Sequence, residues 1–398
     1  MQILNQKYLS IIISHHDLNK IDSGGKIRTT FFVELISTYF KTLIFTPSDK
    51  NIDKNVIKQE NLTKILKVTP GNQFKHKKKN ENKLKQQVLN IVLFIKYGRL
   101  LNKTIKGKKI FIFADHAWKI PHSLILYHFL KKKNKVKLIY LSHNFEIKRA
   151  IKLKDIFKLF YAILSELIIL PLYIDWIILP TNEGKTLFKD IFKKKVIIIP
   201  NSVKKPQRKI KKELNNEELK IIEEIQHLKK QYKIVGFIGD LNYKPNKEAI
   251  KHIMSVSKHL IDKKIMFVIV GKGIPRKKIN NIYFLGFINN VNEVMKNWDV
   301  ACFPLPYGGG SSIKTIHSLM LNIPIVGTYV TFRGIPVNKL LKEGCIYITD
   351  INNLKCKILE ALESDNTKNC AKIISEYYDW NKLIERSYKI FITKIKEE

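Results

Sequence analysis

Twelve short runs of β-branched and other apolar residues alternate with helix-like segments along this chain of 398 residues. Such alternation is typical of parallel α/β sheets, in which a crossover helix follows each strand. The runs form two series of six, the first ending at VIIIP (196–200) and the second beginning at IVGFIG (234–239). The sequence therefore predicts an α/β protein with two Rossmann-like, doubly wound units.

A Pro-containing exit and a charged, helix-prone connector separate the two series, so we expect the domain boundary near residue 203. The predicted organisation is a first domain at 1–203, a second at 204–375 and a C-terminal helix at 376–398. The predicted strands are 8–14, 42–47, 109–114, 136–143, 175–180 and 196–200 in the first series, and 234–239, 265–271, 281–286, 300–305, 323–328 and 345–349 in the second.

The chain is strongly basic, with 72 Lys and Arg against 34 Asp and Glu and a formal net charge of +38. Only seven of the 72 are Arg, and the basic residues are spread over every segment. A nucleic-acid-binding protein usually concentrates Arg, whose planar group grips phosphate in a fork. The charge therefore indicates attraction to anionic surfaces but no specific nucleic-acid partner.

The four cysteines show no zinc-site spacing, and a chain of this length needs no disulfides to hold its core. We therefore expect reduced cysteines and a cytoplasmic protein, with no signal peptide at the N-terminus. The stretch 159–179 is long enough for a membrane span but contains Glu166, Pro171 and Asp175. A buried helix followed by a strand is the simpler interpretation, with a true span as the alternative.

The polar segment 75–85 predicts a loop or a solvated helix start, and its continuation 86–106 mixes apolar residues with Lys. That mixture suits either an amphipathic helix packed on its own sheet or, as the less favoured alternative, a helix lying on an anionic membrane surface.

The segment 304–324, PLPYGGGSSIKTIHSLMLNIP, carries the clearest functional signal. A strand ends in Gly308, Gly309 and Gly310, and a helix follows. Glycines let a ligand approach the backbone, and the N–H groups of a first helical turn favour a bound phosphate. In the same segment, Ser311 and Ser312 could cap the helix or bind phosphate oxygens, and Lys314 and His317 lie three apart, on one helical face. An ordinary Gly-rich turn with a helix cap is the alternative reading.

This segment resembles the donor-binding signature of family 4 glycosyltransferases, which have the GT-B fold of two Rossmann-like domains facing a central cleft. A variant there reads PxRxGGGTRLKxLEAMAxGxPVV. Upstream, GFIGDLNYKPNKEAIKHI (236–253) is similar to the same variant's GxxxYxPNxxA segment, and VIVGKG (268–273) and LGFINNVNEVMKNWDVACFPLP (285–306) match in order and spacing. The resemblance covers essentially the whole second domain, and implies a C-terminal helix that is a candidate to cross back to the first domain.

The first domain resembles the family more loosely. Gly24 and Gly25 lie in a Gly-Gly loop before the first helix, where the resemblance implies approach to the donor diphosphate; a glycine hinge is the alternative. His143 in LSHNFE (141–146) follows a strand, where α/β sheets bind ligands. In the family a histidine there faces the donor sugar, whereas a lone histidine is usually structural. Asn201 is expected to be a hinge residue.

Three positions depart from the family pattern. The usual acid that receives the donor ribose hydroxyls is His317, the usual Arg after Gly239 is Asp240, and the Arg of the GGGTR string is Ser312. A carboxylate accepts two hydroxyls, whereas a neutral imidazole offers one acceptor. The departures leave Lys314 as the clear basic group of the signature, and they put donor specificity in doubt.

The resemblance implies a retaining glycosyltransferase that needs no metal or other cofactor, in keeping with the absence of an Asp-x-Asp motif. His143 and Lys314 are the expected catalytic groups, and Phe287 and Ile288 the base-binding segment. Family context suggests a nucleotide-sugar donor, a glycan or lipid-linked acceptor, synthesis of capsule or lipopolysaccharide, and peripheral contact with the anionic inner membrane. The alternatives are a catalytically impaired homologue acting as a partner subunit, a nucleic-acid-binding protein, and an epimerase of the same fold.

Overall fold

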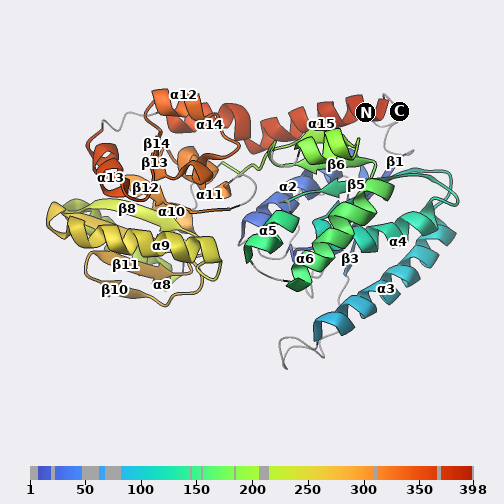
Figure 1. Cartoon of the computed structure of the whole chain (residues 1–398), viewed down its shortest axis with the longest axis horizontal. Helices are drawn as coiled ribbons and strands as arrows, with labels where there is room; N and C mark the ends of the chain where they lie inside the picture. The colour runs from blue at the N-terminus through green and yellow to red at the C-terminus, as the bar shows by residue number, and fades with distance from the viewer. Residues whose placement is uncertain are drawn as a thin grey trace. The chain divides into compact units, whose positions relative to one another are not determined.

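The computed structural model describes residues 8–18, 23–46, 62–67, 82–143, 146–153, 156–182, 185–205, 215–308, 312–364 and 369–396. The chain divides into two compact units (Figure 1). The first comprises Met1–Pro200 together with Ile384–Glu398, and the second comprises Asn201–Leu383. The division after Pro200 lies close to the boundary expected near residue 203.

The first unit is built on a parallel seven-stranded sheet with the order β3-β2-β1-β4-β5-β6-β7. Its central strands are nearly continuous apolar runs, as expected for strands that are covered on both faces. The strands are β1 (Tyr8–Ile13), β2 (Lys41–Thr46), β3 (Leu62–Lys67), β4 (Lys109–Asp115), β5 (Lys135–Leu141), β6 (Trp176–Leu179) and β7 (Lys195–Ile198).

Helices cover both faces of this sheet, and α3 lies beside α4 in Figure 1. The last helix of the chain, α15 (Trp380–Lys396), also belongs here over most of its length, because its Phe391 packs against Phe111 and Trp176 of the sheet. The crossing of the C-terminal helix to the first domain is therefore confirmed. The other helical segments are α2 (Gly24–Tyr39), α3 (Asn82–Thr104), η3 (Ala117–Lys119), α4 (Ile120–Leu130), α5 (Glu146–Leu153), α6 (Ile156–Ile163), η4 (Leu164–Ile169), α7 (Leu170–Tyr173) and η5 (Thr186–Ile191).

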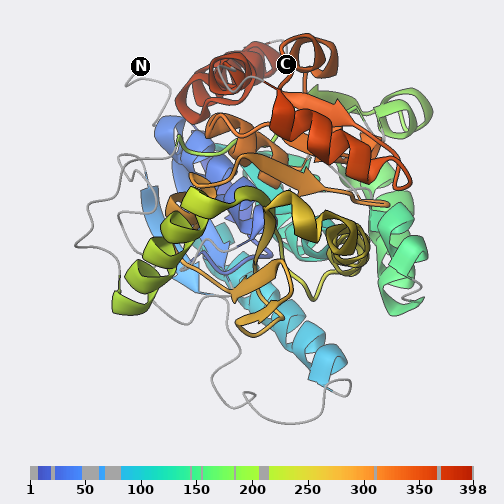
Figure 2. The same cartoon turned by 90° about the vertical axis from the view of Figure 1, so that its left-hand side faces the viewer.

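The second unit has its own seven-stranded sheet with the order β10-β11-β9-β8-β12-β13-β14, parallel except for the edge pair β10 and β11. Figure 2 shows α13 lying against its strands β13 and β14. The strands are β8 (Lys233–Ile238), β9 (Ile265–Val270), β10 (Lys277–Ile279), β11 (Ile282–Gly286), β12 (Val300–Phe303), β13 (Ile325–Gly327) and β14 (Ile346–Ile348).

Local signals explain where the helices of this unit begin. For example, the Asn215 side chain accepts a hydrogen bond from the backbone N–H of Glu218 and caps α8, whose last turn carries Lys229 and Lys230. The helical segments are α8 (Asn216–Gln231), α9 (Lys244–Ser257), η7 (Lys258–Lys263), α10 (Val291–Met295), α11 (Ile313–Met320), η8 (Tyr329–Phe332), α12 (Val337–Lys342), α13 (Leu354–Glu363) and α14 (Cys370–Tyr378).

All twelve predicted strands are present, but the segment expected as one C-terminal helix at 376–398 contains the end of α14 and all of α15. The predicted α/β fold of two parallel-sheet units is confirmed. The sequence did not predict β3 or β10. Both lie at a sheet edge and contain lysines, so neither shows the apolar run of a covered strand.

The two segments considered for membrane contact belong to the first unit. The stretch 159–179 forms the end of α6, then η4, α7 and β6, as the helix-and-strand interpretation predicted. Helix α3 buries Phe94 and Leu101 against its own unit, and residues 75–81 lie outside the described part of the chain. Among the described residues, no helix is both long and apolar enough to cross a membrane.

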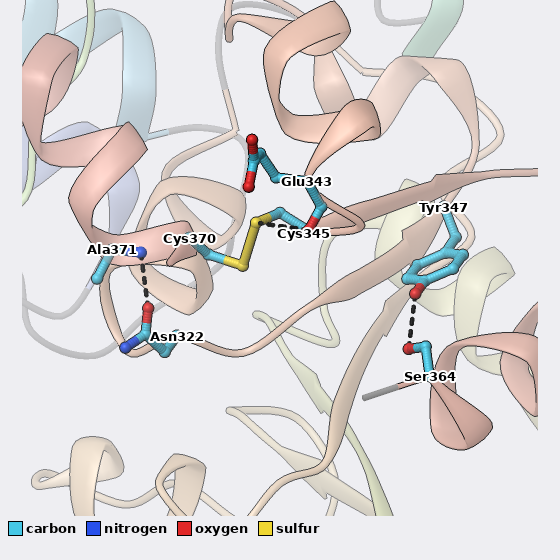
Figure 3. The surroundings of a disulfide bond; sticks show 7 residues. All are labelled: Asn322, Glu343, Cys345, Tyr347, Ser364, Cys370 and Ala371. Carbon is cyan, nitrogen blue, oxygen red and sulfur yellow. Dashed lines mark hydrogen bonds between the residues drawn. A yellow bond between two sulfur atoms is a disulfide. The ribbon is translucent and has the colours of Figure 1, made fainter. Parts of the chain in front are cut away.

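Cys345 and Cys370 form a disulfide, which corrects the expectation of four reduced cysteines (Figure 3). The bond joins the start of β14 to the start of α14, where Ala371 also donates its backbone N–H to the Asn322 side chain. Cysteines 25 residues apart carry no recognisable pairing signal, so only the fold, which brings Cys370 at the start of α14 to Cys345, reveals the pair. Cys302 is free and buried, and Cys356 is free and exposed.

Replacing Cys370 with alanine should lower the free energy of unfolding by about 3 kcal/mol, because the bond restricts a loop of this length in the unfolded chain. Urea unfolding of the oxidised protein measures the loss. Cys356→Ala is the matched control and should unfold like the wild type. Equal stability of the Cys370→Ala and wild-type proteins under oxidising conditions would contradict a structural role for this bond.

Candidate active site

Each sheet changes its direction of growth at one central pair of strands. In the first unit this pair is β1 and β4, and in the second it is β8 and β12. Ligands of open α/β sheets bind beyond the carboxyl ends of such a pair, because the following loops diverge there. The residues after these four strands are therefore the primary candidates for a site in each unit.

In the first unit, His143 lies just after β5 and is bonded to a carboxylate from the end of β4. Its Nε2 is 2.6 Å from Oδ1 of Asp115, and the other carboxylate oxygen accepts a hydrogen bond of 2.9 Å from the Thr29 hydroxyl on α2. Asp115 is fully buried and His143 is buried. Three elements therefore hold the imidazole in a fixed orientation.

The ionisation of this pair follows from its surroundings. Burial alone would raise the pKa of Asp115, but its interaction with His143 holds it well below its usual range. Burial lowers the pKa of His143 in spite of the opposing effect of Asp115. At neutral pH the pair is therefore a carboxylate and a neutral imidazole that donates its Nε2–H.

Three further histidines surround this pair at the ends of β1 and β4. The rings of His15 and His116 stack with their centroids 4.7 Å apart, and His16 lies 5.4 Å from His143. His116 also lies 3.3 Å from the Glu146 carboxylate. Burial lowers the pKa of His16 to about 4. The cluster is thus rich in neutral imidazoles, which can both donate and accept hydrogen bonds.

Helix α2 brings its first turn against the histidine cluster. Gly24 and Gly25, predicted as a loop, are the first two residues of this helix, and Ser23 caps it. A Cβ atom at Gly25 would lie 2.5 Å from Nε2 of His16, so a larger residue there would require the His16 ring to shift. The predicted Gly24, Gly25 and His143 therefore belong to one region of the first unit.

Arg28, one turn further along α2, is a buried cation beside the same region. Its Nε donates to the Ser142 carbonyl and its Nη1 to the Ile199 carbonyl, each at 3.1 Å. Burial lowers the pKa of Arg28 to about 9, against the effect of Asp115. A guanidinium bonded to carbonyls adds positive potential that would favour an anionic ligand.

In the second unit, two glycine-containing turns meet beyond β8 and β9. Gly271 has a φ of 154°, and a Cβ there would overlap the Gly239 carbonyl oxygen, so the two backbones are in direct contact. Asn246 on α9 fixes this corner by donating from Nδ2 to the Asp240 carbonyl at 2.8 Å. The exposed side chain of Asp240 accepts the Asn242 backbone N–H and closes a local turn.

Lys314 lies on the first turn of α11 beside this corner. Its Nζ donates to Oδ1 of Asn246 at 2.7 Å and lies 4.6 Å and 5.2 Å from the ring centroids of Phe237 and Phe303. In the described part of the chain its neighbours are thus an amide and two aromatic rings, rather than a carboxylate. Burial lowers the pKa of Lys314 to about 7, so the group is poised to become fully charged when an anion binds.

His317, one turn later on α11, contacts a different element. Its Nε2 is 2.6 Å from Oδ1 of Asn292 on α10. Burial lowers the pKa of His317 to about 4, so at neutral pH the imidazole is neutral and donates Nε2–H to the amide oxygen. Its Nδ1 is then a hydrogen-bond acceptor.

The remaining predicted residues of the second unit lie on the surrounding loops. Ile288 is buried and Phe287 is 41% exposed, with Lys272 Nζ 4.9 Å from its ring centroid. Gly308 follows β12. Ser312 occupies the N-cap position of α11, but its side chain makes no capping hydrogen bond. Gly309, Gly310 and Ser311 lie outside the described residues.

Sequence reasoning missed several residues that organise these sites, namely Thr29, Arg28, Asp115, His16, His116, Asn246 and Asn292. Their positions in the sequence could have pointed to some of these residues. Asp115 and His116 directly follow the predicted strand 109–114, and Asn246 lies in the quoted segment 236–253. Among the described residues, no group of His, Cys, Asp or Glu is arranged to hold a metal ion.

Comparisons with known proteins place part of the sequence and the overall fold among known groups. Residues 232–364 match the family described as Glycosyl transferases group 1. No curated protein sequence matches the chain.

Solved structures similar to the whole chain include sucrose-phosphate synthase from Thermosynechococcus elongatus, with 14% identity, a TM-score of 0.70, and coverage of 98% of this chain and 100% of that chain. Another is Anabaena HepE in complex with UDP-glucose, with 12% identity, a TM-score of 0.65, and coverage of 97% and 99%. A glycosyltransferase from Rickettsia africae has 13% identity, a TM-score of 0.63, and coverage of 98% and 100%. The chain thus has the GT-B fold of these glycosyltransferases, and its second unit contains a segment that matches glycosyl transferases group 1.

Proposed function

We propose that the protein is a glycosyltransferase that moves a sugar from a nucleotide-sugar donor to a glycan or lipid-linked acceptor. The observation that carries the proposal is Lys314, a partly buried amine on the first turn of the helix that follows the glycine segment. Among the described residues its neighbours are an amide and two aromatic rings, so as an ammonium at the start of α11 it matches the negative charge of a diphosphate. The HepE structure, which contains UDP-glucose, supports a donor of this class.

Transfer requires that charge on the leaving diphosphate is stabilised, that the sugar is oriented, and that water is excluded. In the proposed mechanism Lys314 and the α11 N-terminus stabilise the diphosphate. The backbone around Phe287 and Ile288 holds the base, and His317 accepts a ribose hydroxyl. His143, fixed by Asp115, orients the donor sugar or stabilises charge that develops on it. The Gly24–Gly25 turn adds backbone N–H groups for the diphosphate.

The finer assignments belong to the same proposal. They are retention of anomeric configuration, no required metal or other cofactor, and a cytoplasmic protein at the inner face of the membrane. The biological setting is synthesis of a surface polysaccharide such as capsule or lipopolysaccharide. These assignments are supported by the resemblance to family 4 and by the excess of basic residues.

Thermal unfolding with nucleotide sugars at moderate salt tests the proposal. A UDP- or GDP-linked donor at a hundredfold excess over its Kd should stabilise the protein by about 2.7 kcal/mol. His317→Glu should preserve or improve this stabilisation, because a carboxylate offers more acceptors to ribose hydroxyls than one imidazole nitrogen. Loss of binding in His317→Glu with tolerance of His317→Ala would mean that the imidazole fits a different group.

Measurements of donor turnover distinguish the proposed enzyme from the alternative functions. Release of nucleotide from the donor by the isolated chain would exclude a catalytically impaired partner subunit. Donor binding without turnover, even with added acceptor glycans, would favour that subunit. RNA or DNA binding with a steep salt dependence, together with inertness toward nucleotide sugars, would favour a nucleic-acid-binding protein.

A further inference from the structure

An apolar surface covers the outer side of the helical stretch 156–173 in the first unit, formed by α6, η4 and α7 in succession. Every exposed position among the described side chains of this stretch is a large apolar residue. We call these residues the apolar face. They are Ile156 (84% exposed), Phe160 (68%), Leu167 (41%), Ile168 (51%) and Leu172 (70%).

Two polar residues of the same stretch, Ser165 and Glu166, point inward, which reverses the usual arrangement of a surface helix. Ser165 and Glu166 are fully buried. The Glu166 carboxylate accepts the Tyr140 hydroxyl at 2.9 Å and the backbone N–H groups of Glu146 and Ile147 at 3.2 and 3.1 Å. The acid of this stretch is buried, whereas its leucine and isoleucine side chains are exposed. This arrangement indicates that the exposed side contacts something less polar than water.

Helix α3 shows what an ordinary surface helix of this unit looks like. It exposes Val92 (61%) and Leu100 (56%), but exposed Lys96, Arg99 and Lys103 lie between or beside them, and its apolar side is packed on α4. The alternative considered from the sequence, a membrane-lying helix at 86–106, is therefore less well supported than the apolar face.

The charges near the apolar face indicate its partner. Helix α5, which lies beside α6 in Figure 1, carries an exposed Lys148 and an exposed Ile151 (58%). The chain as a whole has a formal net charge of +38. Two copies of so basic a chain repel each other, which opposes self-association through this face. A surface that is apolar and also anionic satisfies both features.

We propose that the apolar face docks on an anionic lipid surface, with its five side chains inserted at the boundary between headgroups and acyl chains. The helices around the apolar face are also connected to the candidate site of the first unit. Helix α5 begins three residues after His143, and Glu166 holds its first turn by accepting two backbone N–H groups. Lipid docking would therefore bring an acceptor anchored in that surface toward the histidine cluster. The docking itself does not depend on the proposed transfer reaction.

Co-sedimentation of the full chain with vesicles tests this proposal. Wild-type protein should bind vesicles of phosphatidylcholine with one part in three of phosphatidylglycerol, and bind pure phosphatidylcholine more weakly. The variant Ile156→Ser/Phe160→Ser/Leu172→Ser should partition at least tenfold less into the mixed vesicles, because its apolar contribution to insertion is lost. The matched control Val92→Ser/Leu100→Ser should bind like the wild type.

Two measurements separate docking from folding and from donor chemistry. The thermal unfolding of the triple variant and its stabilisation by a nucleotide sugar should equal those of the wild type. Wild-type vesicle binding by the triple variant, or equal losses in both variants, would overturn the proposal. So would a dimer in sedimentation velocity that the triple variant dissociates, because the occupant would then be a second copy. Absence of nucleotide-sugar binding with intact vesicle binding would contradict the proposed function alone.

Discussion

Replacing Lys314 with methionine should lower kcat/KM for the nucleotide-sugar donor by about 10²- to 10³-fold. Methionine keeps most of the aliphatic stem beside Phe237 and Phe303 but removes the charge that stabilises the leaving diphosphate. Initial rates at several donor concentrations measure the effect. Lys357→Met is the matched control, since Lys357 lies on α13 and pairs with Glu360 at the surface; it should leave the rate unchanged.

The same lysine predicts a pH dependence with a definite sign. Because burial lowers the pKa of free Lys314 to about 7, the amine is charged below pH 7 and loses its charge as the pH rises. Donor affinity should therefore fall by about tenfold for each pH unit above 7, until the higher pKa of the bound state is reached. Titration calorimetry with a nucleotide sugar between pH 6 and pH 8.5 measures this slope. The Lys314→Met protein should show weak binding that does not change with pH.

Replacing His143 with alanine should lower kcat by about 10²-fold or more, with a smaller change in KM, because the imidazole acts on the reacting sugar. Asp115→Asn should have a related effect, although the two side chains have the same size. An amide at this position can donate to Nε2 of His143 and would favour the opposite tautomer, and it removes the buried charge. Donor turnover over a range of pH, compared with thermal unfolding, separates catalysis from stability.

Thr29→Val is the graded control for this pair. It removes the hydroxyl that donates to the second oxygen of Asp115 but leaves the carboxylate bonded to His143. A loss much smaller than that of Asp115→Asn is expected. If the Lys314→Met and His143→Ala proteins both retained the wild-type rate, the proposed site would be wrong.

The fold was predictable because most strands of both sheets are covered on two faces and therefore form continuous apolar runs, as IMFVIV in β9 does. The strands that escaped prediction, β3 and β10, are edge strands that carry lysines. The site was predictable only in part. His143, Lys314 and His317 follow recognisable patterns, whereas Asp115, Arg28 and Asn292 acquire their roles from neighbours that are distant in sequence. The Cys345–Cys370 pair is hidden for the same reason.

The return of α15 to the first sheet has a consequence for how the protein is made. Phe391 completes the packing around Phe111 and Trp176, yet the ribosome adds it almost two hundred residues after β7. In the N-terminal half, that patch of the core therefore stays uncovered while the whole second unit is synthesised. The core of the first unit is completed only when α15 has been synthesised and packs on the first sheet.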